Sequence, residues 1–304
     1  MLNKEEIKER IIRLKKKHSA IIIAHNYQHS DIQEVADFVG DSLEISQKAA
    51  QTDAEVIVVC GVRFMAESAS ILSPHKKVLI PDKDADCPLA DMITPEELKR
   101  MKERYPQAVV VCYVNTSADV KAESDICCTS ANADKVVESL RDKSEIIFVP
   151  DKHLAHYVSL KTKRKLIDWN GYCPVHIAIT PEDVLKRKKE HPQAKVIVHP
   201  ECVGKVIELA DGVFSTSGLA KYARESDAQE IIVGTENGFL YRLEKENPEK
   251  RFYPASELAI CPGMKKITLS KVLWSLENMQ YEVKIPQEIV QRAKQAVDRM
   301  LEIR

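Results

Sequence analysis

The chain has 304 residues, and its 45 Lys and Arg residues balance 46 Asp and Glu residues to a formal net charge of −1. This length suffices for several hydrophobic cores, and the balanced charge excludes a strongly basic nucleic-acid or membrane-binding surface. The N-terminal segment is charged and amphipathic, unlike a signal peptide, and no apolar run is long enough for a membrane span. We therefore expect a compact cytoplasmic protein without nucleic-acid or membrane partners.

A charged helix begins each of three similar segments of the chain. These helices are predicted over residues 4–20, 94–108 and 180–194. The second and third share a Thr-Pro start with acidic residues in the first turn, which is typical of a helix N-terminus. The tail from Ile267 begins at the position equivalent to these leading helices and ends in a charged helix over 286–304. We expect this tail to pack back on the first segment and close a ring.

Three apolar strands, separated by helical stretches, follow the leading helix of each segment. They are predicted at 21–25, 55–61 and 76–82, at 109–113, 145–151 and 164–169, and at 196–199, 230–236 and 250–256. Strands that alternate with helices imply crossover connections and a parallel sheet buried on both faces. The sequence therefore predicts an α/β protein of three homologous α/β/α domains with small parallel sheets and pseudo-threefold symmetry, over residues 1–92, 93–178 and 179–266.

The three segments align without a gap over residues 24–42, 112–130 and 198–216. One shared position holds an aspartate in every copy: Asp37, Asp125 and Asp211. Another holds a hydroxyl in every copy: Ser42, Ser130 and Thr216. Each hydroxyl stands beside a helical stretch, so N-capping is the ordinary explanation for any one of them. As a set of three they also suit a cradle for phosphate or carboxylate, because helix N-termini bind anions.

Each segment closes with a Cys-Pro pair, and the three pairs are almost evenly spaced at Cys87, Cys173 and Cys261. If the segments pack around a threefold axis, the three thiolates converge, which predicts an iron–sulfur cluster with one iron that lacks a protein ligand. Such an iron is a Lewis acid that can hold substrate. The other metal interpretation is a three-cysteine zinc site with His176 as the fourth ligand, unless His176 contacts substrate instead.

The other five cysteines lie in or beside predicted strands, where a cysteine is usually a small buried side chain: Cys60, Cys112, Cys127, Cys128 and Cys202. The sequence contains no CxxC motif. This absence argues against a zinc ribbon, a thioredoxin-like site and a local ferredoxin-type cluster, all of which need closely spaced cysteine pairs.

Polar residues end the first strand of each segment, and in parallel α/β units these strand ends line the site. One equivalent position holds His25, Tyr113 and His199, and another holds Tyr27, Asn115 and Glu201. The side chains are polar in all three copies, but the pair of residues differs chemically from copy to copy. This pattern is what one asymmetric site, built from three related domains, requires.

Long, irregular segments then match a known family. They are AHNYQ (24–28), GDSLEIS (40–46), FMAES (64–68), CYVNTSADVKAESDICCTSANA (112–133), WNGYCPVH (169–176), HPEC (199–202), STSG (215–218) and CPGMKKITL (261–269). On these segments the chain resembles the quinolinate synthase family over essentially its whole length. The resemblance implies three α/β/α domains around a central [4Fe–4S] cluster with Cys87, Cys173 and Cys261 as its protein ligands.

The resemblance also implies a transferase reaction of de novo NAD biosynthesis. Iminoaspartate (iminosuccinate) would condense with dihydroxyacetone phosphate to give quinolinate, phosphate and water, and an aspartate oxidase or dehydrogenase would supply the iminoaspartate. The expected substrate-binding residues are His25, Ser42, Tyr113, Asn115, Ser130, His199, Glu201 and Thr216. The expected catalytic residues are Tyr27 and Glu201 as an acid/base pair, with Tyr113 and His199.

Two functions of other classes stay open on the residues alone. One is a hydro-lyase that uses an open-iron cluster on a hydroxy diacid, which an assay with malate or citrate would distinguish. The other is a non-catalytic carrier of a cluster or of zinc. A carrier needs an exposed cluster and no polar lining, and the polar strand ends argue against it.

Overall fold

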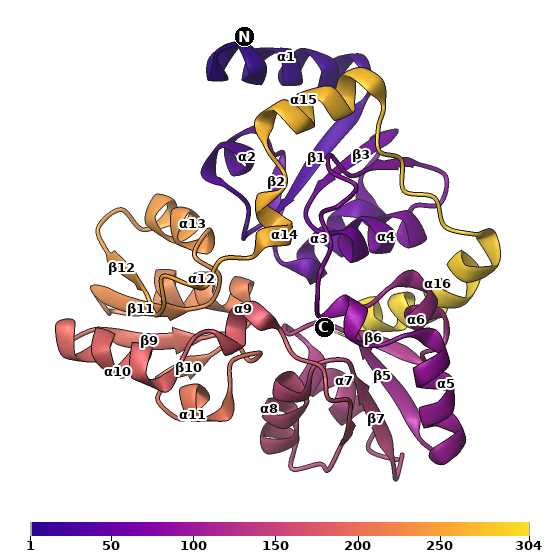
Figure 1. Ribbon diagram of the computed structural model, residues 1–304, viewed down its shortest axis with the longest axis vertical. Helices are drawn as coiled ribbons and strands as arrows, with labels where there is room; N and C mark the ends of the chain where they lie inside the picture. Colours follow the sequence, from indigo (N-terminus) through magenta and orange to yellow (C-terminus); the bar gives the residue numbers. More distant parts are fainter. Residues whose placement is uncertain (1, 304) are drawn as a thin grey trace.

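The computed structural model describes residues 2–303 and contains three four-stranded sheets, whose strands are all parallel (Figure 1). The strand orders are β2-β1-β3-β4, β6-β5-β7-β8 and β10-β9-β11-β12. The three sheets thus have one topology, used once in each repeat of the sequence. This confirms the prediction of an α/β fold with three small parallel sheets, while the domain boundaries near residues 92 and 178 stay a prediction.

The first unit contains α1 (Lys4–Lys17), β1 (Ala20–His25), α2 (Ser30–Val35), β2 (Phe38–Gly40), α3 (Ser42–Gln51), β3 (Val56–Cys60), α4 (Arg63–Leu72) and β4 (Lys77–Leu79). The second unit contains a short 3-10 helix (Ala90–Met92), then α5 (Pro95–Arg104), β5 (Val109–Tyr113), α6 (Ala118–Ala122), β6 (Ile126–Cys128), α7 (Ala133–Ser139), β7 (Ile146–Val149), α8 (Lys152–Thr162), β8 (Ile167–Asp168) and α9 (Pro174–Ile177).

The third unit contains α10 (Pro181–Glu190), β9 (Lys195–Val198), α11 (Gly204–Ile207), β10 (Gly212–Val213), α12 (Thr216–Glu225), β11 (Glu230–Gly234), α13 (Phe239–Glu246), β12 (Arg251–Pro254) and α14 (Pro262–Lys265). The leading helices α5 and α10 begin as the sequence predicted. Thr94 and Thr180 form capping boxes at their N-termini, each with a proline in the first turn.

Each sheet has one strand more than the sequence predicted. The extra strands are the edge strands β2, β6 and β10, which span only two or three residues. A strand this short carries no recognisable apolar run or alternation, so periodicity cannot reveal it.

The three shared aspartates fasten these edge strands to the sheets. Their carboxylates each accept a backbone N–H near the start of the neighbouring strand at 2.8 Å, from Ile22, Val110 and Val196. Their own N–H groups donate back to the carbonyls of the same three residues. The repeated aspartate is therefore a structural clamp that sets where each edge strand begins.

The C-terminal tail packs along two units (Figure 1). Helix α15 (Leu269–Asn278) lies against α1, and α16 (Gln287–Glu302) contacts α4 of the first unit and both α6 and β6 of the second. The amide of Asn132 also donates to the carbonyls of Met300 and Ile303, at 3.3 and 3.4 Å. The tail thus joins the first two units. Across residues 2–303, none of the helices is long and apolar enough to cross a bilayer.

Candidate active site

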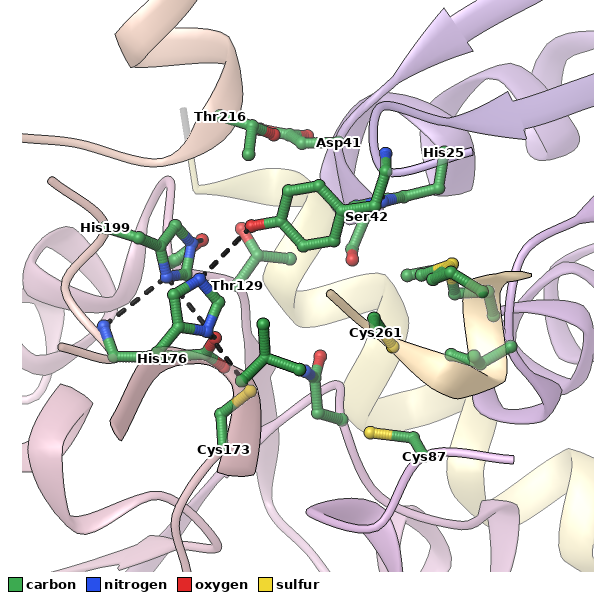
Figure 2. A pocket seen from close by; sticks show the side chains of 18 of the residues that line it. His25, Asp41, Ser42, Cys87, Thr129, Cys173, His176, His199, Thr216 and Cys261 are labelled. Carbon is green, nitrogen blue, oxygen red and sulfur yellow. Dashed lines mark hydrogen bonds and ion pairs between the residues drawn. The ribbon is translucent and has the colours of Figure 1, made fainter. Parts of the chain in front are cut away.

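A cavity of about 590 Å³ lies where the three units meet, at the carboxyl ends of their strands (Figure 2). All residues that the sequence predicted for the site line this cavity: His25, Tyr27, Ser42, Cys87, Tyr113, Asn115, Ser130, Cys173, His199, Glu201, Thr216 and Cys261. The fold therefore brings residues from all three repeats to one place. Their individual roles stay predictions.

The three cysteines of the Cys-Pro pairs differ from the other five in their exposure to solvent. Cys87, Cys173 and Cys261 are free and partly exposed, whereas Cys60, Cys112, Cys127, Cys128 and Cys202 are buried. Figure 2 shows the three along one side of the cavity, on three separate chain segments. Cys173 and Cys261 each precede a short helix whose first residue is the following proline, which has no N–H to satisfy there.

The spacing of these thiols distinguishes between the two metal interpretations. Among residues 2–303, the one group of three ligand side chains with donor atoms all within 4.8 Å is Cys173, His176 and Glu201. The three repeat cysteines therefore lie too far apart for one zinc ion, whose thiolate bonds are about 2.3 Å. Three separated thiols around a cavity fit a polynuclear cluster better. Burial raises the pKa of Cys87 to about 12, so this thiol stays protonated until a metal displaces the proton.

Two buried carboxylates accept hydrogen bonds from the backbone of two of these cysteines. Asp151 Oδ2 accepts the N–H of Cys173, and Glu236 Oε1 accepts the N–H of Cys261, both at 3.1 Å. Asp151 and Glu236 follow strands β7 and β11 and are fully buried. The first unit has Val62 at the equivalent position, which lines the apolar side of the cavity instead.

The hydroxyls of Ser42 and Thr216 do not cap their helices. They are the first residues of α3 and α12, and the caps are their neighbours Asp41 and Ser215. Asp41 accepts two backbone N–H groups at 3.0 Å, and Ser215 accepts one at 3.3 Å. N-capping is therefore the wrong explanation for Ser42 and Thr216. Because their neighbours cap the helices, both hydroxyls are left to line the cavity beside two helix N-termini.

Glu201 is the centre of a buried polar cluster. Its Oε2 lies 2.7 Å from Nδ1 of His176 and 3.3 Å from Nδ1 of His199. The two imidazole rings stack with centroids 4.5 Å apart, and His199 Nε2 lies 3.1 Å from Ser130 Oγ. Burial alone raises the pKa of Glu201, but His176 and His199 together bring that pKa below its ordinary value. Glu201 is therefore a carboxylate in this cluster.

Apart from the carboxyl groups of Asp41 and Glu201, the polar part of the lining consists of neutral groups. Burial lowers the pKa of His25 to about 3 and raises the pKa values of Tyr27 and Tyr113 well above their ordinary value. His25 Nδ1 accepts the N–H of Tyr27 at 3.2 Å, so its hydrogen is on Nε2. Within the described residues no lysine or arginine lines the cavity. Anions must therefore be bound by hydroxyl, imidazole and amide groups and by the helix N-termini of α3 and α12.

Two buried acceptors in the lining have no hydrogen-bond partner within residues 2–303. They are Oε1 of Glu201 and Oδ1 of Asn115. Buried polar atoms in folded proteins are almost always hydrogen-bonded, so unpaired acceptors indicate a place for a ligand. The ligand must carry N–H or O–H donors in addition to any anionic groups.

The sequence missed part of the site. The polar residues Asp41 and Thr129 and the apolar wall of Val62, Phe64 and Met65 also line the cavity. Val62, Asp151 and Thr235 all stand just after the carboxyl end of the third strand of their unit, β3, β7 or β11. The sequence prediction rested on polar residues at the ends of the first strands, although the same rule applies to every strand of a parallel sheet.

Comparisons with known proteins identify the family. A family model described as quinolinate synthetase A protein matches residues 9–302. The chain belongs to this family. It is therefore an enzyme, a quinolinate synthase.

Curated relatives from distant organisms match nearly the whole chain. A quinolinate synthase of Dehalococcoides mccartyi is 58% identical over 98% of this chain and 99% of the relative. One of Methanosarcina barkeri is 55% identical over 100% of this chain and 99% of the relative. One of Thermodesulfovibrio yellowstonii is 55% identical over 96% of this chain and 97% of the relative.

Proposed function

We propose that this quinolinate synthase condenses iminoaspartate with dihydroxyacetone phosphate to give quinolinate, phosphate and water, as a step of de novo NAD biosynthesis. The observation that carries the proposal is the composition of this cavity. Its lining combines three partly exposed cysteines, one from each repeat, with a set of neutral hydrogen-bond donors. An aspartate oxidase or dehydrogenase is the upstream enzyme that would supply the imine.

The substrates have the chemistry that the lining can bind. Iminoaspartate carries two carboxylates, and dihydroxyacetone phosphate carries a phosphate. Ser42, Thr216 and His25 present donors beside the N-termini of α3 and α12, where anions are stabilised. The unpaired oxygens of Glu201 and Asn115 accept the hydroxyl or imine hydrogens that the same molecules carry.

The cysteines Cys87, Cys173 and Cys261 would hold a [4Fe–4S] cluster. When bound, that cluster supplies an iron without a protein ligand, which is a Lewis acid for a substrate oxygen or nitrogen. Asp151 and Glu236 hold the backbone of two of these cysteines in place. Tyr113 and Asn115 orient the substrate on the second-unit side of the cavity.

The condensation, phosphate elimination and ring closure need proton transfers at carbon and oxygen. Glu201, kept as a carboxylate by its two histidines, is placed to accept a proton. Tyr27, kept neutral by burial, is placed to donate one. The two are not in direct contact, since His176 lies between them, 3.4 Å from the Tyr27 hydroxyl.

The test is anaerobic purification, followed by assays of iron, sulfide and quinolinate formed from iminoaspartate and dihydroxyacetone phosphate. About four iron and four sulfide per chain, with activity lost in air, would support the proposal. Stoichiometric zinc without sulfide would contradict the cluster. Dehydration of malate or citrate in place of quinolinate formation would favour the hydro-lyase alternative.

A further inference from the structure

The end of strand β11 in the third unit places a hydroxyl behind the cavity. Thr235 follows β11 directly and is only 1% exposed. Its Oγ1 lies 2.6 Å from the Tyr27 hydroxyl and 2.9 Å from Nε2 of His176. Thr235 itself does not line the cavity, so it reaches substrate only through these two side chains.

The other two units have no such hydroxyl. Three equivalent backbone hydrogen bonds fix the register between the units: Arg63 to Ala85, Lys152 to Gly171 and Asn237 to Ala259. In this register Gly61 and Pro150 are the counterparts of Thr235. The hydroxyl is therefore a particular feature of the third unit, on the side where Tyr27, His176 and Glu201 meet.

The hydrogen bonds in this group can be given a direction. Nδ1 of His176 lies 2.7 Å from the Glu201 carboxylate, which can only accept, so Nδ1 carries the hydrogen. With His176 as the neutral imidazole, Nε2 then accepts the single hydrogen of Thr235. A lone pair of Thr235 Oγ1 is left to accept the hydrogen of Tyr27.

We propose that Thr235 is a positioning residue of the reaction, which aligns the Tyr27 hydroxyl with His176 and so couples Tyr27 to Glu201. One hydroxyl bonded to both side chains holds the phenol and the imidazole at fixed distances. Without it, Tyr27 loses its 2.6 Å partner and keeps only the longer contact of 3.4 Å to His176. This inference rests on the proposed function, because it assigns Thr235 to the proton transfers of that reaction.

The test compares Thr235→Val, which keeps the shape and removes the hydroxyl, with Thr235→Ser, which keeps the hydroxyl. For the valine variant we expect kcat for quinolinate formation to fall by about 10-fold to 100-fold, as for a misplaced catalytic group, with KM for dihydroxyacetone phosphate and iron content unchanged. The serine variant should recover most of the rate. Thr162→Val, at the end of α8, is the control, since its hydroxyl bonds only Val158 of its own helix at 2.7 Å.

A double-mutant cycle makes the test independent of general damage to the fold. If Thr235 acts through Tyr27, then Thr235→Val costs little further rate in a Tyr27→Phe background. An unchanged kcat in Thr235→Val, equal losses in the valine and serine variants, or additive losses in the cycle would overturn the inference. A parent enzyme that makes no quinolinate would overturn the proposed function instead.

Discussion

Arg242 of α13 donates from Nη1 to Oδ1 of Asn26, the residue that follows β1, at 2.7 Å. This contact joins the third unit to the first and fixes which way the Asn26 amide faces. Its Nδ2 therefore donates to Thr216 Oγ1, also at 2.7 Å. Because the Thr216 oxygen already accepts this hydrogen, its own hydrogen is free to point into the cavity. Asn26, which is fully buried, thus leaves Thr216 a free hydroxyl hydrogen, which in the proposed reaction would bind an anionic substrate.

Asn26→Asp should reverse this hydrogen bond while the ion pair with Arg242 keeps the side chain in place. Aspartate cannot donate, so Thr216 must turn its hydrogen away from the cavity. We expect KM for one of the two anionic substrates to rise about 10-fold, the effect of one lost hydrogen bond of roughly 1.4 kcal/mol. Steady-state kinetics with each substrate varied in turn check this. Asn278→Asp, which adds the same charge on an exposed helix end, should leave KM unchanged, and a similar rise there would contradict the explanation.

Glu201→Gln should lower kcat by about 100-fold to 10,000-fold, the range for removal of a general base. The amide keeps the shape of the side chain but cannot accept a proton from substrate. Quinolinate formation and iron content, measured on the same preparation, separate a chemical effect from a lost cofactor. Glu208→Gln, on the exposed end of α11, is the matched control. Full turnover by the Glu201 variant with normal iron content would remove Glu201 from the chemistry.

Asp151→Asn should weaken metal binding, although it leaves all three cysteine ligands unchanged. Asp151 accepts backbone hydrogens of His153, Leu154 and Cys173, and an amide has only one accepting oxygen for them. Loss of such an outer hydrogen bond commonly weakens metal binding by about 10-fold to 100-fold. Anaerobic release of iron to a chelator should therefore be faster than in the parent. Asp168→Asn, an exposed change in β8, should match the parent, and equal release from all three proteins would contradict the role of Asp151.

The thermal midpoint should fall as the pH is lowered from 7 to 5, in part because of His25. Its pKa is about 3 in the folded protein, against an ordinary 6.5, because burial opposes its charge. Below pH 6.5 the unfolded chain therefore binds a proton that the folded chain does not, and stability is lost as the pH falls. His25→Gln should reduce this slope, while exposed His156→Gln should not. An identical slope in His25→Gln and the parent would show that His25 contributes nothing to it.

The sequence revealed the parts of the site that recur. The Cys-Pro pairs, the shared hydroxyls and the ends of the first strands repeat at fixed positions, and all of them line the cavity. The apolar runs of β1, β5 and β9 are long enough to be recognised as buried strands. Repetition and hydrophobic pattern therefore sufficed for three small parallel sheets and for the lining contributed by the first strands, but not for the short edge strands β2, β6 and β10.

The residues behind the lining were not predictable in the same way. Asn26, Thr235 and Arg242 act through contacts between units that are far apart in the sequence, with separations of up to 216 positions. A buried Thr or Asn in a sequence gives no sign of its partner, since its role depends on which unit packs against it. The spacing of His176 from Cys173 is visible in the sequence, but its contact with Glu201 appears only in the folded structure.

The equivalent strand ends carry unlike residues: His25, Tyr113 and His199 at one position, and Val62, Asp151 and Glu236 at another. A ring of three separate, identical subunits would have to place the same residue at all three corners and would surround its centre with three equal faces. Joining the units in one polypeptide removes that restriction, because each corner can be altered alone. The single chain is thus what permits a nearly symmetric scaffold to tell two different substrates apart.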